Sequence, residues 1–353
     1  MAALIFLAAP LFSEDLDDPN LDPDRRNEII QSQEDKWGYE EESVRLPQRI
    51  QVSDILRKML NCPTLSFNPR YFQKLRLGPL SIEVPANTFS GESVEVQALI
   101  LQTPADYALA DISLEYRESG TPVVLESDGM FQLTFLQGGK PVEPASPITV
   151  KMSPQSGDSM NMYRLDGDSW TEMGSTGMVT DWPEGCDVRR DDRNPGLILV
   201  ESPYCEGEYP AVRVFRDITR SGWWNFDKPA DNITCITGDF NSPNKNYTVL
   251  LRAVGLDYLG LSHAVIKGKR FGINVAANQS VKVYALVTDK DSRSVYVGSL
   301  EPVKTQNKTE FIDDRDFNGC QDVGSLKLKR SSVRLLTDRK AFLSVIGLPE
   351  GGI

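Results

Sequence analysis

Short runs in which apolar and polar residues alternate dominate the chain from about residue 75 onward. In the first of these runs Leu80, Ile82 and Val84 alternate with polar residues. A period of two over four to eight residues, bounded by Gly, Pro and Asn, is typical of a β-strand with one buried face. The runs that predict strands are 80–84, 94–100, 131–135, 148–152, 197–200, 212–215, 249–253, 273–275, 281–287, 295–297 and 326–328. Many short strands separated by turn residues predict an all-β fold with two antiparallel β-sandwiches, and no long stretch has the helical period.

The region before these strands has a different character. Residues 14 to about 42 are polar and acidic, and such a segment buries too little apolar surface to order itself. Ser53 to Leu60 has the pattern of a short helix, with Ser53 as the N-cap and Pro63 beyond its end. We therefore expect residues 14–74 to form an acidic leader with one short helix.

The first residues, MAALIFLAAPLFS, form an apolar run that is too short to span a bilayer. A run of this length followed by a polar tract is typical of a secretory signal peptide, which we place at residues 1–13. It lacks the usual Lys or Arg after Met1, and the alternative is a buried N-terminal strand. No other segment of the sequence is long and apolar enough to predict a membrane span.

Two parts of the chain resemble modules of bacterial exported proteins. The segment GPLSIEVPANTFSGESVEVQALIL (78–101) is similar to a strand that ends in I-P-A-N-x-F and is followed by a V-x-V strand. TPVVLESDGMFQLTF (121–135) resembles another strand of the same proteins, with Asp128 where they have a glycine. GWWNFDKP is similar to the segment that closes this module. The resemblance implies a first sandwich over residues 75–228.

The following part resembles a carboxypeptidase regulatory-like (transthyretin-like) sandwich, which opens on TCITGDF and ends on GCQDVGSLKL. It implies a second sandwich over residues 229–330 and leaves residues 331–353 as a C-terminal strand or tail. Such modules are commonly non-catalytic companions of other domains, so the resemblance does not imply peptidase activity.

The formal net charge of −12 limits the classes of partner. Nucleic-acid-binding proteins present a basic face, and anionic membrane surfaces attract basic segments, so we expect neither partner. An acidic surface suits cation binding, although it also simply favours solubility.

Five cysteines and one histidine limit the chemistry further. The cysteines form no C-x-x-C pair, which argues against a zinc site or a thioredoxin-like redox motif. In an exported protein cysteines are commonly paired in disulfides. From their places relative to the predicted strands we expect the bridges Cys235–Cys320 and Cys186–Cys205, with Cys62 free. The single His263 leaves little room for histidine-based metal or acid–base chemistry and is expected to be structural.

The segment DDRDFNGCQD (313–322) is the best candidate for a metal site. Asp314, Asp316 and Asn318 stand at alternate positions before a glycine, as in the first half of a calcium loop, and Asp322 could supply a further oxygen. The position that usually holds a bidentate Glu is Ser325. The alternatives are a weak Ca²⁺ site and a solvated acidic turn, and we expect no other cofactor.

Trp223 and Trp224 are adjacent in GWWNFDKP, where the two predicted sandwiches meet. Large aromatic side chains dominate burial, so we expect the pair to pack at this junction. The alternative is a platform on which a glycan stacks.

No nucleophile elbow or phosphate-binding loop is present in the sequence, and 50 acidic residues select no catalytic pair. We therefore expect a non-enzymatic exported protein of the cell envelope or cell surface, with a structural or adhesive role and a protein or glycan partner. We expect to find the exported protein in the periplasm, on the outer cell surface or in the medium. The alternative hypothesis is a carbohydrate-binding accessory module, and the third hypothesis, which we consider less favoured, is a glycosidase-type enzyme.

Overall fold

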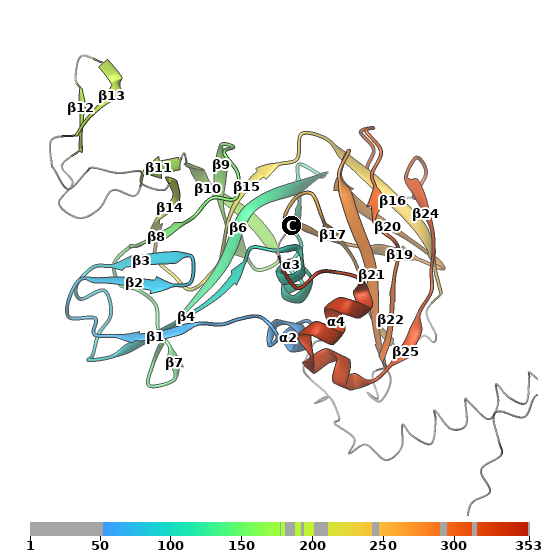
Figure 1. Cartoon of the computed structure of the whole chain (residues 1–353), viewed down its shortest axis with the longest axis horizontal. Coiled ribbons are helices and arrows are strands. Elements are labelled where there is room, and N and C mark those ends of the chain that lie inside the picture. Colours follow the sequence, from blue (N-terminus) through green and yellow to red (C-terminus); the bar gives the residue numbers. More distant parts are fainter. Residues whose placement is uncertain are drawn as a thin grey trace, which may run out of the picture. The chain divides into compact units, whose positions relative to one another are not determined.

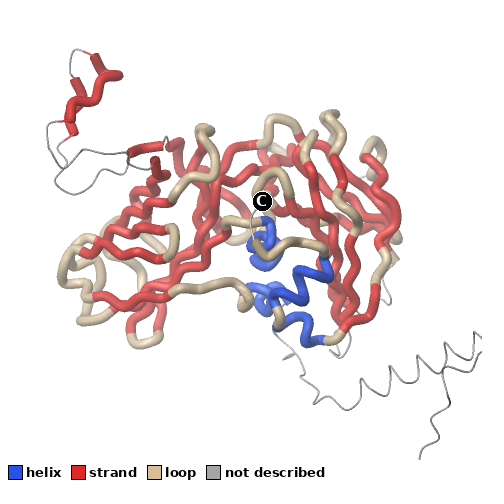
Figure 2. The backbone as a smooth tube through the Cα atoms, in the orientation of Figure 1, coloured by secondary structure: helices blue, strands red, loops and turns tan. Residues whose placement is uncertain are grey.

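The computed structural model describes residues 52–176, 178–180, 188–191, 194–200, 211–241, 247–289, 295–312 and 316–351. Strands dominate this part of the chain, as the alternating pattern predicts, and they assemble into sandwich-like pairs of sheets (Figures 1 and 2). The predicted signal peptide, the acidic leader, Cys186, Cys205 and Asp314 lie outside the described residues.

The first sandwich pairs an eight-stranded sheet with a five-stranded one. The eight-stranded sheet has the order β1-β4-β6-β15-β9-β10, and β5 and β7 also pair with β6. These strands are β1 (Thr64–Phe67), β4 (Val94–Leu101), β5 (Glu115–Glu118), β6 (Thr121–Gln137), β7 (Lys140–Pro141), β9 (Met160–Asp166), β10 (Ser169–Thr176) and β15 (Gly222–Pro229). The five-stranded sheet has the order β11-β14-β8-β3-β2, with β2 (Gln73–Leu77), β3 (Leu80–Val84), β8 (Ile148–Met152), β11 (Met178–Thr180) and β14 (Ala211–Ile218).

The core of the first sandwich consists of the inward positions of both sheets. Ile82 and Val150 are fully buried on one sheet, and Val96 and Phe135 are fully buried on the other. The outward positions of β3 and β8 are only partly buried, so both strands show the alternation that the sequence predicts. A separate hairpin is formed by β12 (Val188–Asp191) and β13 (Asn194–Val200).

The second sandwich pairs a four-stranded sheet, β19-β20-β16-β24, with a six-stranded one, β18-β17-β21-β22-β25, in which β23 also pairs with β21. Its strands are β16 (Ile233–Phe240), β17 (Tyr247–Gly255), β18 (Leu261–His263), β19 (Val265–Lys267), β20 (Arg270–Ala276), β21 (Ser280–Asp289), β22 (Val295–Ser299), β23 (Val303–Lys304), β24 (Gln321–Leu326) and β25 (Lys329–Ser331). All described strand pairs are antiparallel except β16 with β24, which is parallel.

A disulfide joins Cys235 and Cys320, as the sequence analysis predicts. Cys235 is fully buried on β16, Cys320 directly precedes β24, and their Cα atoms are 4.7 Å apart. The bridge therefore links β16, the first strand of this sandwich, to the start of β24, with which β16 pairs in parallel. Cys62 is free and exposed.

Three boundaries differ from the expectations. Strands begin at Thr64, so residues 64–74, which we expected in the leader, supply β1 and the first two residues of β2. Residues 326–328 do not form one strand, because β24 ends at Leu326 and β25 begins at Lys329. The C-terminal segment is helical rather than a strand or tail, since it contains η2 (Val333–Thr337) and α4 (Arg339–Ile346).

Two further helices complete the described chain. The predicted short helix is present as α2 (Val52–Arg57), although Ser53 lies inside it and uses its hydroxyl for a tertiary hydrogen bond instead of an N-cap. The sequence analysis missed α3 (Pro104–Ala110), which interrupts the path from β4 to β5. Within the described residues, no helix is long and apolar enough to cross a membrane.

Candidate functional site: the junction between the sandwiches

The two sandwiches are joined by a layer of helices. One hydrophobic cluster contains residues of α2, α3, η2 and α4 together with the outward face of the eight-stranded sheet and the outward face of β17, β21 and β22. On β21, for example, Val283 and Ala285 belong to the core of the second sandwich, whereas Tyr284 and Leu286 belong to this junction cluster. Such strands are buried on both faces, which explains their almost continuous apolar sequence.

Helix α3 is fixed at its start by a capping box. The Thr103 hydroxyl accepts from the Asp106 amide at 3.2 Å, and the Asp106 carboxylate accepts from the Thr103 amide at 3.1 Å. Pro104 occupies the first turn, where its missing N–H is not needed. Arg339 of α4 donates to the other oxygen of Asp106 at 2.9 Å, so the cap also links the two helices.

The end of α3 carries the most heavily bonded carboxylate of the junction. Asp111 is the C-cap residue, with a left-handed φ of 51°, and its side chain is 3% exposed. Arg252 of β17 donates to it through Nε at 2.5 Å and Nη2 at 3.3 Å, and the Ser53 hydroxyl of α2 donates at 2.5 Å. His263 Nε2 of β18 lies 3.5 Å away. One carboxylate thus connects the α3 segment of the first sandwich, α2 and two strands of the second sandwich.

The electrostatics of Asp111 reflect this set of partners. Burial alone would raise its pKa, but the nearby His263 and the hydrogen bonds and positive charge of Arg252 outweigh burial, and the pKa lies well below its usual range. Asp111 is therefore a carboxylate at neutral pH. The His263 side chain beside it is 38% exposed, and its structural role stays a prediction.

Further hydrogen bonds cross the junction. The Tyr284 hydroxyl donates to the carbonyl of Ala108 at 3.1 Å, and Asn274 donates to Glu115 at 2.9 Å. Backbone bonds also cross, for example from the amide of Leu114 to the carbonyl of Leu261 at 2.8 Å. Since buried backbone and side-chain groups of both sandwiches satisfy each other here, the contact resembles a continuous fold more than two domains on a linker.

Trp223 and Trp224 are both buried, at 8% and 1% exposure, but they belong to different cores. Trp223 is in the junction cluster, as the sequence analysis predicts for the pair, whereas Trp224 lies in the core of the first sandwich near Phe215. A glycan platform needs an exposed ring face, and neither indole has one. The Nε1 of Trp224 has no hydrogen-bond partner within the described part of the chain, contrary to the usual requirement of a buried indole.

Beneath the Trp pair a chain of polar side chains runs through the buried sheet. Tyr107 of α3 donates to Ser127 at 2.7 Å, Ser127 donates to Asn225 at 2.6 Å, and the amide of Asn225 donates to Asp227 at 2.5 Å. Asp227 is fully buried; its burial and the nearby charge of Asp128 raise its pKa well above the usual range. The fold therefore favours the neutral acid at this position.

Asp128 forms an ion pair in which both side chains are fully buried. Its carboxylate accepts from Arg213 Nε of β14 at 2.8 Å and from the amides of Gln155 and Ser156 at 2.9 and 2.5 Å. Arg213 also donates to the carbonyl of Asp158 at 2.5 Å. This pair connects the two sheets of the first sandwich. It was overlooked from the sequence, although both Asp128 and Arg213 are charged residues within otherwise largely apolar strand segments.

The acidic turn is only partly described. Asn318 donates to both oxygens of Asp316, at 2.9 Å from its backbone amide and 2.6 Å from its side chain. The Asp322 carboxylate accepts from the amide of Gly324 at 2.8 Å. Among the described residues no group of three or more His, Cys, Asp or Glu side chains converges as a metal site. Since Asp314 is not described, the calcium site stays a prediction.

Comparison of the sequence with family models and with curated proteins finds no match. Among solved structures the chain has a likeness to a gamma-CGTase from the alkalophilic Bacillus clarkii, with a TM-score of 0.18 and 10% identity. The alignment covers 74% of this chain and 41% of that protein, so the chain spans less than half of its length. A likeness at this TM-score carries no argument about fold or function, and the interpretation of the chain rests on its own geometry.

Proposed function

We propose that the chain is a non-enzymatic exported protein of the cell envelope or cell surface, in which the two sandwiches act as one structural or adhesive unit. The observation that supports this role is the network of buried contacts around Asp111 at the junction of the two sandwiches. A carboxylate with bonds to α2 and β17 and the helical layer around it hold the two sandwiches together. A unit that bears load or presents a binding surface benefits from a junction that does not hinge.

Two other features agree with this role. Disulfides such as Cys235–Cys320 persist mainly in oxidising compartments, which agrees with export. The buried acids Asp128 and Asp227 are fully enclosed, so a substrate has no access to either group. The hydrogen bonds of Asp128 with Arg213 suit it to holding the two sheets of the first sandwich together.

Export is tested by expressing the full chain with a C-terminal tag in a Gram-negative host and fractionating the cells. We expect a product that lacks the first residues, found outside the cytoplasm, with Cys235 and Cys320 oxidised. Intact N-termini and reduced thiols in the cytoplasmic fraction would contradict export. The single-unit character is tested separately by urea unfolding, in which we expect one transition for both sandwiches. Two well-separated transitions would contradict it.

A further inference from the structure

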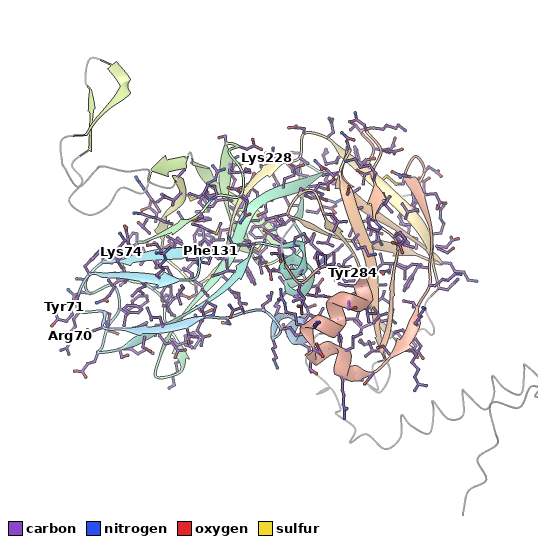
Figure 3. All side chains as sticks on the ribbon, in the orientation of Figure 1. Arg70, Tyr71, Lys74, Phe131, Lys228 and Tyr284 are labelled. Atoms are coloured by element: carbon purple, nitrogen blue, oxygen red, sulfur yellow. A yellow bond between two sulfur atoms is a disulfide. The ribbon has the colours of Figure 1, made fainter. Side chains whose placement is uncertain are left out.

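The loop between β1 and β2 exposes two adjacent aromatic rings. Tyr71 is 64% exposed and Phe72 is 58% exposed, the two highest values among the large hydrophobic residues that the structure describes as exposed. Figure 3 shows Tyr71 with Arg70 and Lys74 at the end of the first sandwich that carries β1 and β2. Exposed aromatic clusters are uncommon without a partner, because leaving them in water is unfavourable.

The loop is held in place by its own hydrogen bonds. The side chain of Asn68 accepts from the amide of Arg70 at 3.0 Å, and Gln73 donates to the carbonyl of Asn68 at 3.1 Å. The buried Pro69 accepts from the amide of Asn87 at 2.7 Å. Asn87 belongs to the VPANTF segment and has a left-handed φ of 63°. The rings are thus presented on a braced loop, and preorganisation of this kind lowers the entropy lost on binding.

A row of positive charge continues from the rings along β2. Lys74 and Arg76 are exposed and alternate with the inward Leu75 and Leu77, so they share one face of the strand. Within the described part of the chain neither cation has an ion pair. Glu83, which is opposite Lys74 in the register, is bonded to Lys151 at 2.9 Å. This local positive charge stands out in a chain with a net charge of −12.

Arg70, next to the rings, forms an exposed ion pair with Glu92 at 3.1 Å. Exposed pairs contribute little to stability, and the guanidinium has five donors, so most of its hydrogen-bonding capacity is available to a ligand. A simpler explanation for Lys74 and Arg76 is that their charges prevent β2 from pairing with another chain, since β2 lies at the edge of its sheet. That explanation accounts for the cations and does not account for the two rings.

We propose that Tyr71 and Phe72, with the row formed by Lys74 and Arg76, bind an anionic polysaccharide. The rings offer apolar faces to the C–H faces of sugar rings, and the cations pair with carboxylates along an extended chain. Side chains two residues apart on a strand are about 7 Å apart, so the two long, flexible cations can each reach a carboxylate at a different place along a linear polymer. The inference names a partner class for the adhesive role proposed above and rests on that role.

The test uses the full chain and oligogalacturonate of defined length, with binding measured by calorimetry at low and high salt. We expect binding that weakens as salt rises, because exposed charges are screened. Tyr71→Ala/Phe72→Ala and Lys74→Gln/Arg76→Gln should each lower the affinity by about tenfold or more, which corresponds to about 1.4 kcal/mol. The matched controls are Phe311→Ala and Lys327→Gln/Lys329→Gln on the second sandwich, and they should bind as the parent does. All variants are first checked for an unchanged melting temperature.

Three comparison probes decide whether the partner class is right. The same oligomer with its carboxylates reduced to alcohols should bind more weakly, because the charge contacts are lost. Equal binding of polyglutamate would overturn the proposal, since charge alone would then suffice. Preferential binding to vesicles that contain anionic lipid would also overturn it, as would a lack of binding to oligogalacturonate. None of these results bears on export, which the fractionation experiment tests independently.

Discussion

Replacement of Asp111 by alanine should weaken the junction more than any exposed charge change. The side chain is 3% exposed and accepts hydrogen bonds from Arg252 and Ser53. Its removal leaves the Arg252 guanidinium, itself 10% exposed, without its counter-ion. Removing one partner of a buried pair costs about 3–5 kcal/mol, because the other charge stays buried without compensation. The left-handed backbone at Asp111 adds to the loss, since alanine tolerates that conformation less well than aspartate does.

The measurement is urea unfolding followed by tryptophan fluorescence and by far-UV circular dichroism. We expect Asp111→Ala to lower the free energy of unfolding by about 3–5 kcal/mol. The matched control is Glu92→Gln, which removes the exposed partner of Arg70 and should change stability by less than about 1 kcal/mol. A double-mutant cycle with Arg252→Leu should show that the two losses are not additive. A loss below about 1 kcal/mol for Asp111→Ala would refute the idea that this carboxylate holds the junction.

The pH dependence gives a second test of the same residue. The pKa of Asp111 is lower in the folded state than in the unfolded state, so its charge stabilises the fold above the unfolded pKa of about 3.9. That contribution is lost as the pH falls through the folded pKa. The stability difference between the parent and Asp111→Asn should therefore be constant from about pH 5 to 8 and shrink below about pH 4. A difference that does not change with acidification would contradict the assignment.

Three further outcomes follow from the buried groups. Trp224→Ala should lower the free energy of unfolding by about 3–5 kcal/mol, measured by urea titration, because the ring is fully enclosed in the first core. Asp227 has a raised pKa in the fold, so its contribution to folding stability is present at low pH and is lost as the pH rises through that pKa. Asp227→Asn should therefore gain stability relative to the parent as the pH increases. A stability difference that is independent of pH would contradict this. Reduction of Cys235–Cys320, which closes a loop across 85 residues, should cost about 4–5 kcal/mol on the chain-entropy model, visible as a lower melting temperature with reductant.

The alternation of apolar residues located most strands because each has a core face that the sequence marks directly. Segments such as 80–84 and 148–152 match β3 and β8 at both ends. Helix α2 was predicted, but α3 and the C-terminal helices were missed because they are too short to show a clear period of their own. Helix α3 has only seven residues, yet Thr103, Pro104 and Asp106 form a recognisable start signal.

The C-terminal helix shows the same lesson. Asp338 accepts from the amide of Ala341 as the N-cap, and Gly347 ends the helix with a φ of 73°. Phe342, Leu343 and Ile346 have the spacing of one helical face and are all buried. These signals were present in residues expected to be a strand or tail. Capping residues are therefore better guides than periodicity when an all-β chain contains short helices.

Contacts between distant segments carry no comparable signal. Asp111 and Arg252 are 141 residues apart, and Asp128 and Arg213 are 85 apart. A charged residue in an apolar strand indicates that some partner exists, because an unpaired buried charge is very unfavourable. It does not identify that partner. The sequence therefore predicted where along the chain the two sandwiches meet, but not which residues contact each other at the junction.

The different positions of Trp223 and Trp224 could have been predicted from the sequence, because both lie in one strand. Successive side chains of a strand point to opposite faces, so two adjacent tryptophans on β15 cannot form one flat surface. Residues 223–227 of β15 are all buried although their side chains alternate between the two faces of the sheet, so both faces of this strand are covered. One ring must then serve the core between the sheets and the other must serve the layer outside it. The alternation alone argues against a shared glycan platform, and it requires the separate roles that Trp223 and Trp224 have in the structure.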